Sequence, residues 1–166
     1  MKLVICVFLM LISAKECDKN KVQLANDTAS ETPTEMTERR LQDSTKLTYQ
    51  AVTRGSFLQV WVQGDSISFT NDRDLKMVRS FQLPKEDKEA LITLLSTVDE
   101  QTLPELEAPS KAHQYDGAQL AWLEISEGEN SYKTSIFDHG NPPKSISALV
   151  EKLLSVKGNI EKKNKQ

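Results

Sequence analysis

SFLQVWVQGDSISFT, residues 56–70, is the stretch that decides the fold. From residue 57 to residue 63, aliphatic side chains alternate with aromatic or amide side chains. This period of two is that of an extended strand whose two faces have different environments. Gly64-Asp65 follows, and a two-residue connection of this kind is typical of a hairpin. The stretch therefore predicts two antiparallel strands. The two faces of the first strand are Leu58, Val60 and Val62 on one side, and Phe57, Gln59 and Trp61 on the other.

One more strand is predicted before this hairpin and one after it. Residues 47–54 (LTYQAVTR) form a β-rich run, and Gly55 separates them from the stretch above. After a turn cluster at 71–74, side chains alternate again from Met77 to Phe81, which indicates a fourth strand. Leu83-Pro84 ends it, because proline lacks the N–H that a strand ladder needs.

The first helix is predicted directly after Pro84, whose ring favours the first helical turn. Glu86 and Asp87 suit the positive end of the helix dipole. The apolar residues that follow recur with the period of one helix face. They are Leu91, Leu94, Leu95 and Val98. The connection from 102 to 117 is long enough to cover part of a core.

The rest of the chain predicts one more hairpin and one more helix. Ala118–Ser126 and Ser131–Phe137 read as its two strands. A turn at 138–143 leads into the second helix, which Lys157-Gly158 is expected to end. The tail 158–166 is basic and expected to be frayed. The apolar stripe of this helix is Ile146, Leu149, Val150, Leu153 and Leu154.

The predicted order is thus four strands, a helix, two strands and a helix. This order is typical of an α+β domain in which both helices pack on one face of an antiparallel sheet, burying both apolar stripes at once. The expected domain is 47–157. The sequence contains no repeat, no glycine-rich phosphate loop and no catalytic motif, so no cofactor, no metal and no catalytic residue is assigned.

Composition excludes several functional classes. The chain of 166 residues carries 21 Lys and Arg against 24 Asp and Glu, a net charge of -3. A nucleic-acid partner is not expected, because such a protein must neutralise many phosphates. With only two Cys and two His, the chain also lacks the ligands of a Cys-based zinc site and the cysteines of a disulfide scaffold.

Residues 1–17 resemble an export signal. Lys2 precedes an apolar run from Leu3 to Ile12, which is too short to span a bilayer. Cleavage can follow Ala14, or Cys17 can be lipidated as in bacterial lipoproteins, although Lys15 and Glu16 replace the small residues of that motif. We expect an exported protein of the periplasm, outer membrane or cell surface, anchored to the membrane if Cys17 carries a lipid.

Residues 18–46 are expected to be a flexible polar tether. They are rich in Thr, Ser, Asn, Asp and Glu and contain no aromatic residue. Such a segment buries too little apolar surface to offset the entropy of ordering it. It therefore either holds the domain away from a membrane or is an ordinary disordered terminus.

Aromatic residues give one candidate binding surface. Phe57 and Trp61 share a strand face, and Trp122 lies opposite Leu123 and Ile125 in the strand 118–126. The more usual arrangement puts large aromatic residues in the core beneath the helices. If the helices cover the aliphatic face instead, Phe57, Trp61 and Trp122 would form a patch for a protein partner.

Two polar loops give a second candidate. His113 and Asp116 lie in one loop, Asp138 and His139 in another, and both loops adjoin the same predicted hairpin. The four side chains could bind a metal, or a His-Asp pair could act as a base and its orienting group. Asp and Gly in such loops are also ordinary turn formers, and this interpretation is the favoured one.

The arrangement of signal, cysteine, spacer and small domain resembles exported or lipid-anchored small proteins of Bacteroidetes-type bacteria. The stretch 54–156 also remotely resembles emfourin-type inhibitors of thermolysin-like metalloproteases. The matching positions are mostly structural and imply no inhibitory residue. They are Arg54-Gly55-x-Phe57, Leu83-Pro84-x-Glu86, Leu103-Pro104, Asp116 before the strand of Trp122 and Ile125, Phe137-Asp138, and Pro142 before Ile146 and Leu149.

Three functions are consistent with these patterns. The first is a non-enzymatic binding or accessory protein of the bacterial cell envelope, with an envelope protein as partner. The second, implied by the resemblance alone, is protease inhibition. The third is a small metal-binding protein or hydrolase that uses His113, Asp116, Asp138 and His139.

Overall fold

A computed structural model describes residues 44–164. The predicted signal 1–17, the lipidation candidate Cys17, nearly all of the predicted tether and the last two residues lie outside this range, so those expectations remain predictions. No helix within the described residues has the length and apolar character needed to cross a membrane.

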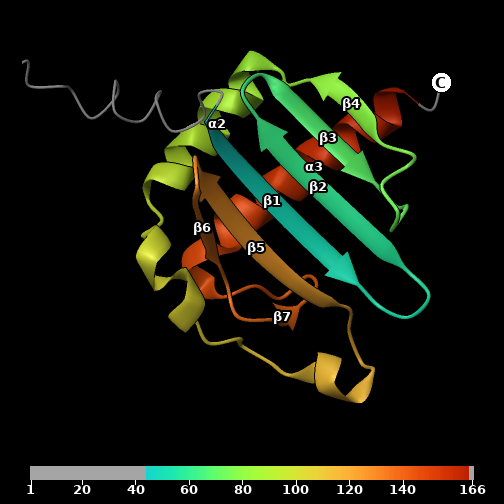
Figure 1. Cartoon of the computed structure of the whole chain (residues 1–166), viewed down its shortest axis with the longest axis vertical. Helices are drawn as coiled ribbons and strands as arrows, with labels where there is room; N and C mark the ends of the chain where they lie inside the picture. The colour runs from blue at the N-terminus through green and yellow to red at the C-terminus, as the bar shows by residue number, and fades with distance from the viewer. Residues whose placement is uncertain (1–43, 165–166) are drawn as a thin grey trace, which may run out of the picture. The chain divides into compact units, whose positions relative to one another are not determined.

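The described residues form a mixed helix-and-strand domain around a seven-stranded antiparallel sheet, which confirms the predicted class at this level (Figure 1). The strand order is β4-β3-β2-β1-β5-β6, and β7 also pairs with β5. The strands are β1 (Thr45–Val52), β2 (Phe57–Gln63), β3 (Ser66–Thr70), β4 (Arg79–Gln82), β5 (Leu120–Glu127), β6 (Asn130–Lys133) and β7 (Phe137–Asp138).

Two α-helices and three short 3-10 segments complete the described fold. The helices are α2 (Lys85–Ser96) and α3 (Ser147–Lys163), and α3 crosses behind the sheet in Figure 1. The connection between α2 and β5, predicted as a loop, contains η1 (Glu100–Glu105) and η2 (Ala112–Tyr115). The third 3-10 segment, η3 (Lys144–Ile146), leads directly into α3.

The core lies between one face of the sheet and the two helices. Alternation along β1 buries Leu47, Tyr49 and Ala51 completely, and the matching face of β2 buries Val60 and Val62. These residues belong to one apolar cluster with residues of both helices. The helical members of the cluster are Leu91, Ile92, Leu95, Leu149, Val150, Leu153, Val156 and Ile160.

The turn at Gly64-Asp65 joins β2 to β3 as predicted. Gly64 has φ 56°, a left-handed conformation that glycine adopts at little cost. Two contacts join this turn to α2 and to the residues just before it. The Leu83 N–H donates to the Asp65 carbonyl at 2.8 Å, and Lys88 of α2 pairs with the Asp65 carboxylate. The hairpin that decides the fold is thereby fastened to α2.

The second hairpin differs from its prediction, because its outer strand is interrupted. The structure has β6 and β7 where the sequence predicted one strand over Ser131–Phe137. At the break, the Thr134 hydroxyl accepts from the Leu123 N–H at 3.1 Å, and the Thr134 N–H donates to the Leu123 carbonyl at 2.9 Å. Thr134 therefore satisfies the backbone of β5 while the chain leaves the regular ladder.

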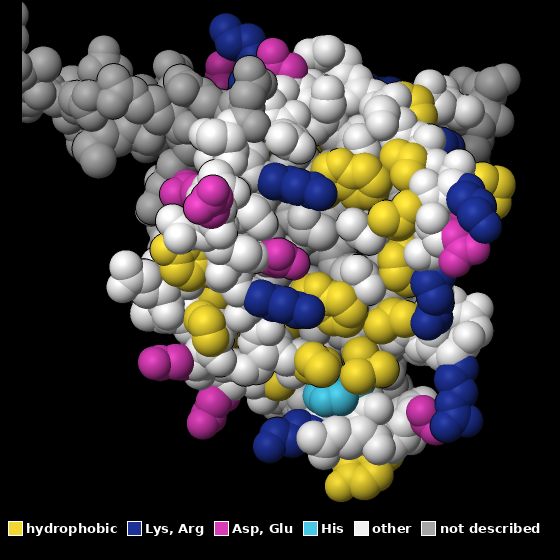
Figure 2. Space-filling view, viewed as in Figure 1, with side chains coloured by type: hydrophobic (Ala, Val, Ile, Leu, Met, Phe, Trp, Pro, Cys, Tyr) yellow, Lys and Arg dark blue, Asp and Glu magenta, His cyan; other side chains and the backbone are white. Residues whose placement is uncertain are grey.

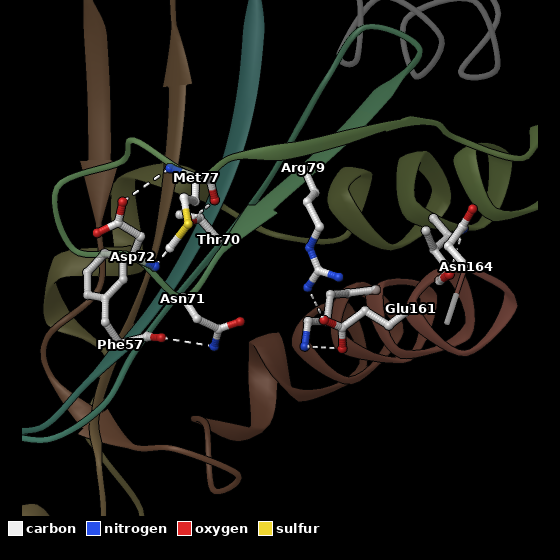
Figure 3. A network of polar contacts seen from close by, with 10 residues as sticks. Phe57, Thr70, Asn71, Asp72, Met77, Arg79, Glu161 and Asn164 are labelled. Atoms are coloured by element: carbon white, nitrogen blue, oxygen red, sulfur yellow. Dashed lines mark hydrogen bonds and ion pairs between the residues drawn. The ribbon is translucent and has the colours of Figure 1, made fainter. Parts of the chain in front are cut away.

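The prediction that the last helix ends at Gly158 was wrong. α3 continues to Lys163, and Ile160 is buried. Glu161 accepts a hydrogen bond from Lys157 at 2.6 Å and pairs with Arg79 of β4 (Figure 3). These contacts outweigh the helix-breaking tendency of one glycine, which is about 1 kcal/mol. Residues 158–163 of the expected frayed tail are instead the last turns of α3, and one of them, Ile160, belongs to the core.

The cations around Glu161 also lie against an aromatic pair. Arg79 lies 4.7 Å and Lys157 5.6 Å from the ring centre of Phe69, which stacks on Phe81 at 5.5 Å. Partial burial raises the pKa of the Glu161 carboxyl, but Lys157 and Arg79 outweigh it, and the net shift is downward. The carboxylate therefore stays ionised and joins α3 to β4.

The start of the domain is also earlier than predicted. β1 begins at Thr45, which is buried, whereas the predicted boundary was between residues 46 and 47. Thr45 and Lys46 pair with Glu127 and Ser126 of β5, which extends the ladder beyond the β-rich run. The folded unit thus includes residues from both sides of the predicted range 47–157.

Replacing Ile160 tests whether the end of α3 belongs to the core. Ile160→Ala is expected to lower the free energy of unfolding by about 2 kcal/mol, because it leaves a cavity at a buried position. Urea denaturation measures this change. Lys162→Ala, at an exposed position in the same turn, should leave the midpoint unchanged. Equal midpoints for the two variants would contradict the assignment.

Candidate functional site

One face of the sheet has no covering layer within residues 44–164, and it carries both tryptophans of the chain. The strand pairing places Trp61 opposite Thr48 of β1, and Trp122 opposite Gln50 of β1. We call this the open face. Figure 2 views it directly, and two cationic side chains there each lie beside a group of hydrophobic side chains. The remaining positions are mostly Ser, Thr and Gln.

Each tryptophan of the open face is paired with a lysine. The Lys133 ammonium lies 4.0 Å from the ring centre of Trp122, and the Lys46 ammonium lies 5.3 Å from that of Trp61. Both distances are within the range of attractive cation–π contacts. Both indoles are half-buried, so part of each ring still faces solvent. The result is two similar Lys–Trp pairs, one joining β1 to β2 and the other joining β6 to β5.

Phe57 lies on the same face but contributes less to its surface. It is 9% exposed, and the Arg73 guanidinium lies 5.9 Å from its ring centre. Its carbonyl accepts from the Asn71 side chain at 3.0 Å (Figure 3). Of the three aromatic candidates, Trp61 and Trp122 are therefore the accessible ones.

The expectation that the aromatic residues lie beneath the helices was wrong for both tryptophans. The helices cover the aliphatic face, where valine, leucine and alanine side chains of β1, β2 and β5 are completely buried. In an antiparallel strand the alternate residues must then point to the other face. The two large indoles lie there because the strand pattern, not their hydrophobicity, determines their side of the sheet.

A second exposed surface is the loop 71–78 between β3 and β4, which the sequence predicts as a turn and the start of a strand. Its apolar side chains are unusually accessible, at 74% for Met77, 46% for Leu75 and 38% for Val78. Leu75 also has φ 57°, a conformation that costs a leucine roughly 1 kcal/mol. Met77 and Val78 were predicted in the fourth strand, but β4 begins only at Arg79.

Hydrogen bonds hold this loop in one conformation (Figure 3). The Asp72 carboxylate accepts from the backbone N–H groups of Asp74, Lys76 and Met77 at 3.1, 2.8 and 3.1 Å. These hydrogen bonds lower the pKa of Asp72, and the bond from the Asp74 N–H has the largest effect. The Thr70 hydroxyl donates to the Met77 carbonyl at 2.6 Å. The apolar side chains are thus displayed from an ordered loop.

The polar loops converge, and Asp138 is the centre of their contacts. Its carboxylate accepts from the backbone N–H groups of Ala112 and His113 at 2.9 and 2.7 Å, and from His113 Nδ1 at 2.6 Å. The Ser110 hydroxyl also donates to it, and this bond is the largest cause of the lowered pKa of Asp138. Four donors on one buried carboxylate favour the turn-forming interpretation over a reactive acid.

The side chains of the other two members of this candidate site, His139 and Asp116, do not take part in the hydrogen bonds to the Asp138 carboxylate that join the two loops. Tyr49 is completely buried, and its hydroxyl is hydrogen-bonded to His139 Nδ1 at 2.6 Å. Burial raises the pKa of Tyr49 and, together with the charge of Lys157, lowers the pKa of His139, so both groups are neutral at pH 7. Asp116 is the exposed residue that ends η2, with φ 58°.

Metal binding finds no support in this part of the chain. Among residues 44–164, no group of three or more His, Cys, Asp or Glu side chains is placed to hold a metal ion. The one close pair, His113 and Asp138, joins two loops. The cluster therefore fixes the connection 102–117 to β7.

Replacing Asp138 tests this structural role. Because the native pKa is lowered, the stabilisation is complete above about pH 4 and is lost as the pH falls below that value. Asp138→Asn is expected to lower Tm by about 5 °C or more at neutral pH. The difference from the wild type should shrink in acid. Asp116→Asn, at an exposed left-handed position that asparagine tolerates, is the control and should match the wild type.

No protein-family model matches the chain, and no curated protein matches it.

Proposed function

We propose that the protein is a non-enzymatic binding domain of the bacterial cell envelope that engages a partner through the open face. In this proposal it is an α+β two-layer scaffold with both helices on one side of the sheet, exported and held at a membrane through Cys17. The single observation that carries the proposal is the position of Trp61 and Trp122, which are half-buried on the uncovered side of the sheet.

The energetics of interfaces support this assignment. Tryptophan is among the residues most enriched at binding hot spots, because its large ring gains much from losing contact with water. The two indoles are mounted on β2 and β5, which both pair with the central strand β1. A sheet holds such side chains in place without a large entropic cost on binding. The polar cluster around Asp138 is already occupied by structural hydrogen bonds.

Site-specific photo-crosslinking in cells of the native host tests the proposal. A photoreactive residue at Gln50 or Gln59, on β1 and β2 of the open face, should give one discrete crosslinked species in the envelope fraction. Trp61→Ala or Trp122→Ala should remove it, since truncating a hot-spot residue costs about 2 kcal/mol or more.

The control position is Glu151, an exposed residue of α3 on the other side of the domain. It should yield no discrete species. Equal crosslinking from Gln50, Gln59 and Glu151, or crosslinks that persist in both tryptophan variants, would contradict the proposal.

A second candidate function, protease inhibition, is supported by the loop 71–78. An inhibitor needs an exposed, ordered segment that enters the active-site cleft of the enzyme without large rearrangement. Asp72 provides the order, and Leu75, Met77 and Val78 provide exposed apolar side chains.

Titration of a thermolysin-like protease tests this candidate. Inhibition by the wild type should weaken by about tenfold or more in Met77→Asp, because the substitution puts a charge on the apolar contact. Ile136→Asp is the matched control, since Ile136 is an exposed apolar residue outside the loop. Full protease activity in the presence of excess wild-type protein, or equal inhibition by the two variants, would exclude this function.

A further inference from the structure

We propose that the open face recognises an acidic, aromatic-rich segment of a protein partner, with each Lys–Trp pair receiving one carboxylate together with a neighbouring apolar side chain. This inference rests on the proposed function, because it names the chemistry of the partner that the same face binds.

Charge complementarity indicates the acidic partner. Within the described strands, the accessible charges of the open face are Lys46, Lys133 and the carboxylate of Glu124. The register with Leu120 puts Asp138 on this side as well, but it is 3% exposed and its carboxylate is occupied by hydrogen bonds from the loop 110–113. Glu124 accepts a hydrogen bond from the Ser131 hydroxyl at 2.6 Å. The chain as a whole has a net charge of -3, so the accessible charge of this face is opposite in sign to the net charge of the chain. An acidic segment is therefore attracted to this side of the sheet.

The position of each lysine relative to its ring indicates the apolar component. An ammonium held over an indole lies beside apolar surface rather than alone in solvent. A carboxylate that pairs with this ammonium brings its neighbouring side chains onto the exposed part of the ring. Aromatic neighbours gain most from that contact, because offset ring pairs add about 0.5–1.5 kcal/mol beyond the area they bury.

The spacing of the two pairs indicates an extended segment. Trp61 and Trp122 are on the strands that flank β1, and their β1 partners, Thr48 and Gln50, are two positions apart. Standard sheet dimensions then put their Cα atoms roughly 12 Å apart. An extended chain covers that distance in about four residues, so a short segment reaches both pairs. Gln50 lies between them on β1, Gln59 is next to it on β2, and both offer amide groups to the backbone of the segment.

A nucleic acid fits this face less well, because two lysines neutralise few of its phosphates. An acidic glycan shares the carboxylates but offers no aromatic ring to the indoles. We therefore assign the face to a protein segment, and the glycan becomes one arm of the test.

Binding of the random copolymer poly(Glu,Tyr) to the full-length protein provides the experiment. Selective excitation of tryptophan reports on this face alone, because the chain has no other tryptophan. Poly(Glu,Tyr) should bind more tightly than poly-Glu, and alginate and poly-Lys should not bind. Lys46→Gln/Lys133→Gln should weaken binding by about tenfold or more and reduce its dependence on salt.

Lys85→Gln/Lys162→Gln is the matched control, because it removes the same charge from exposed positions outside the open face. It should bind as the wild type does. Circular dichroism melts of both double variants show that the fold is intact.

Three outcomes would overturn the inference. They are no binding of poly(Glu,Tyr), equal binding by the two double variants, and binding of alginate in preference to the copolymer. The proposed function fails separately, when the crosslinks from Gln50 and Gln59 do not depend on the tryptophans.

Discussion

The pleat of the three central strands is the constraint on which the rest of this structure depends. In β1, β2 and β5, every residue that faces the helices forces its neighbour to face the other way. The aliphatic set meets α2 and α3 and forms the core, and the tryptophans are consequently on the open face. Core formation and display of a binding surface are thus two results of one alternation.

Local pattern was sufficient to predict the elements that have a clear period. The hairpin at Gly64-Asp65 is as expected, because it depends on residues close together in the sequence. The residues of the two predicted helical stripes all lie in the core or against it, although Val98 follows α2 and Ile146 is in η3. Which face the helices cover was not predictable in this way. Both faces of β2 are apolar enough to be buried, and the choice depends on whether Val60 and Val62 fit against the helices better than Trp61 does.

Contacts between distant residues explain the main failures. Gly158 is a helix breaker by propensity, but Arg79, 82 positions from Glu161, fastens the following turn to the sheet. Similarly, the four candidate residues of the polar loops looked alike in sequence. Their different roles follow from contacts made only in the folded chain. Asp138 accepts hydrogen bonds from backbone groups 25 and 26 positions away, whereas His139 is hydrogen-bonded to Tyr49 of β1. The lysines of the open face also needed the strand register, since Lys133 and Trp122 are on different strands.

The place of β1 in the sheet has a mechanical consequence. The described chain enters the domain through this strand, which pairs along its length with β2 on one side and β5 on the other. A force applied at Ser44 along the axis of β1 loads both ladders in shear instead of opening hydrogen bonds one after another. Shear divides the force among many bonds at once. A domain held from its N-terminal side would therefore resist traction far better than one attached through an edge strand such as β4.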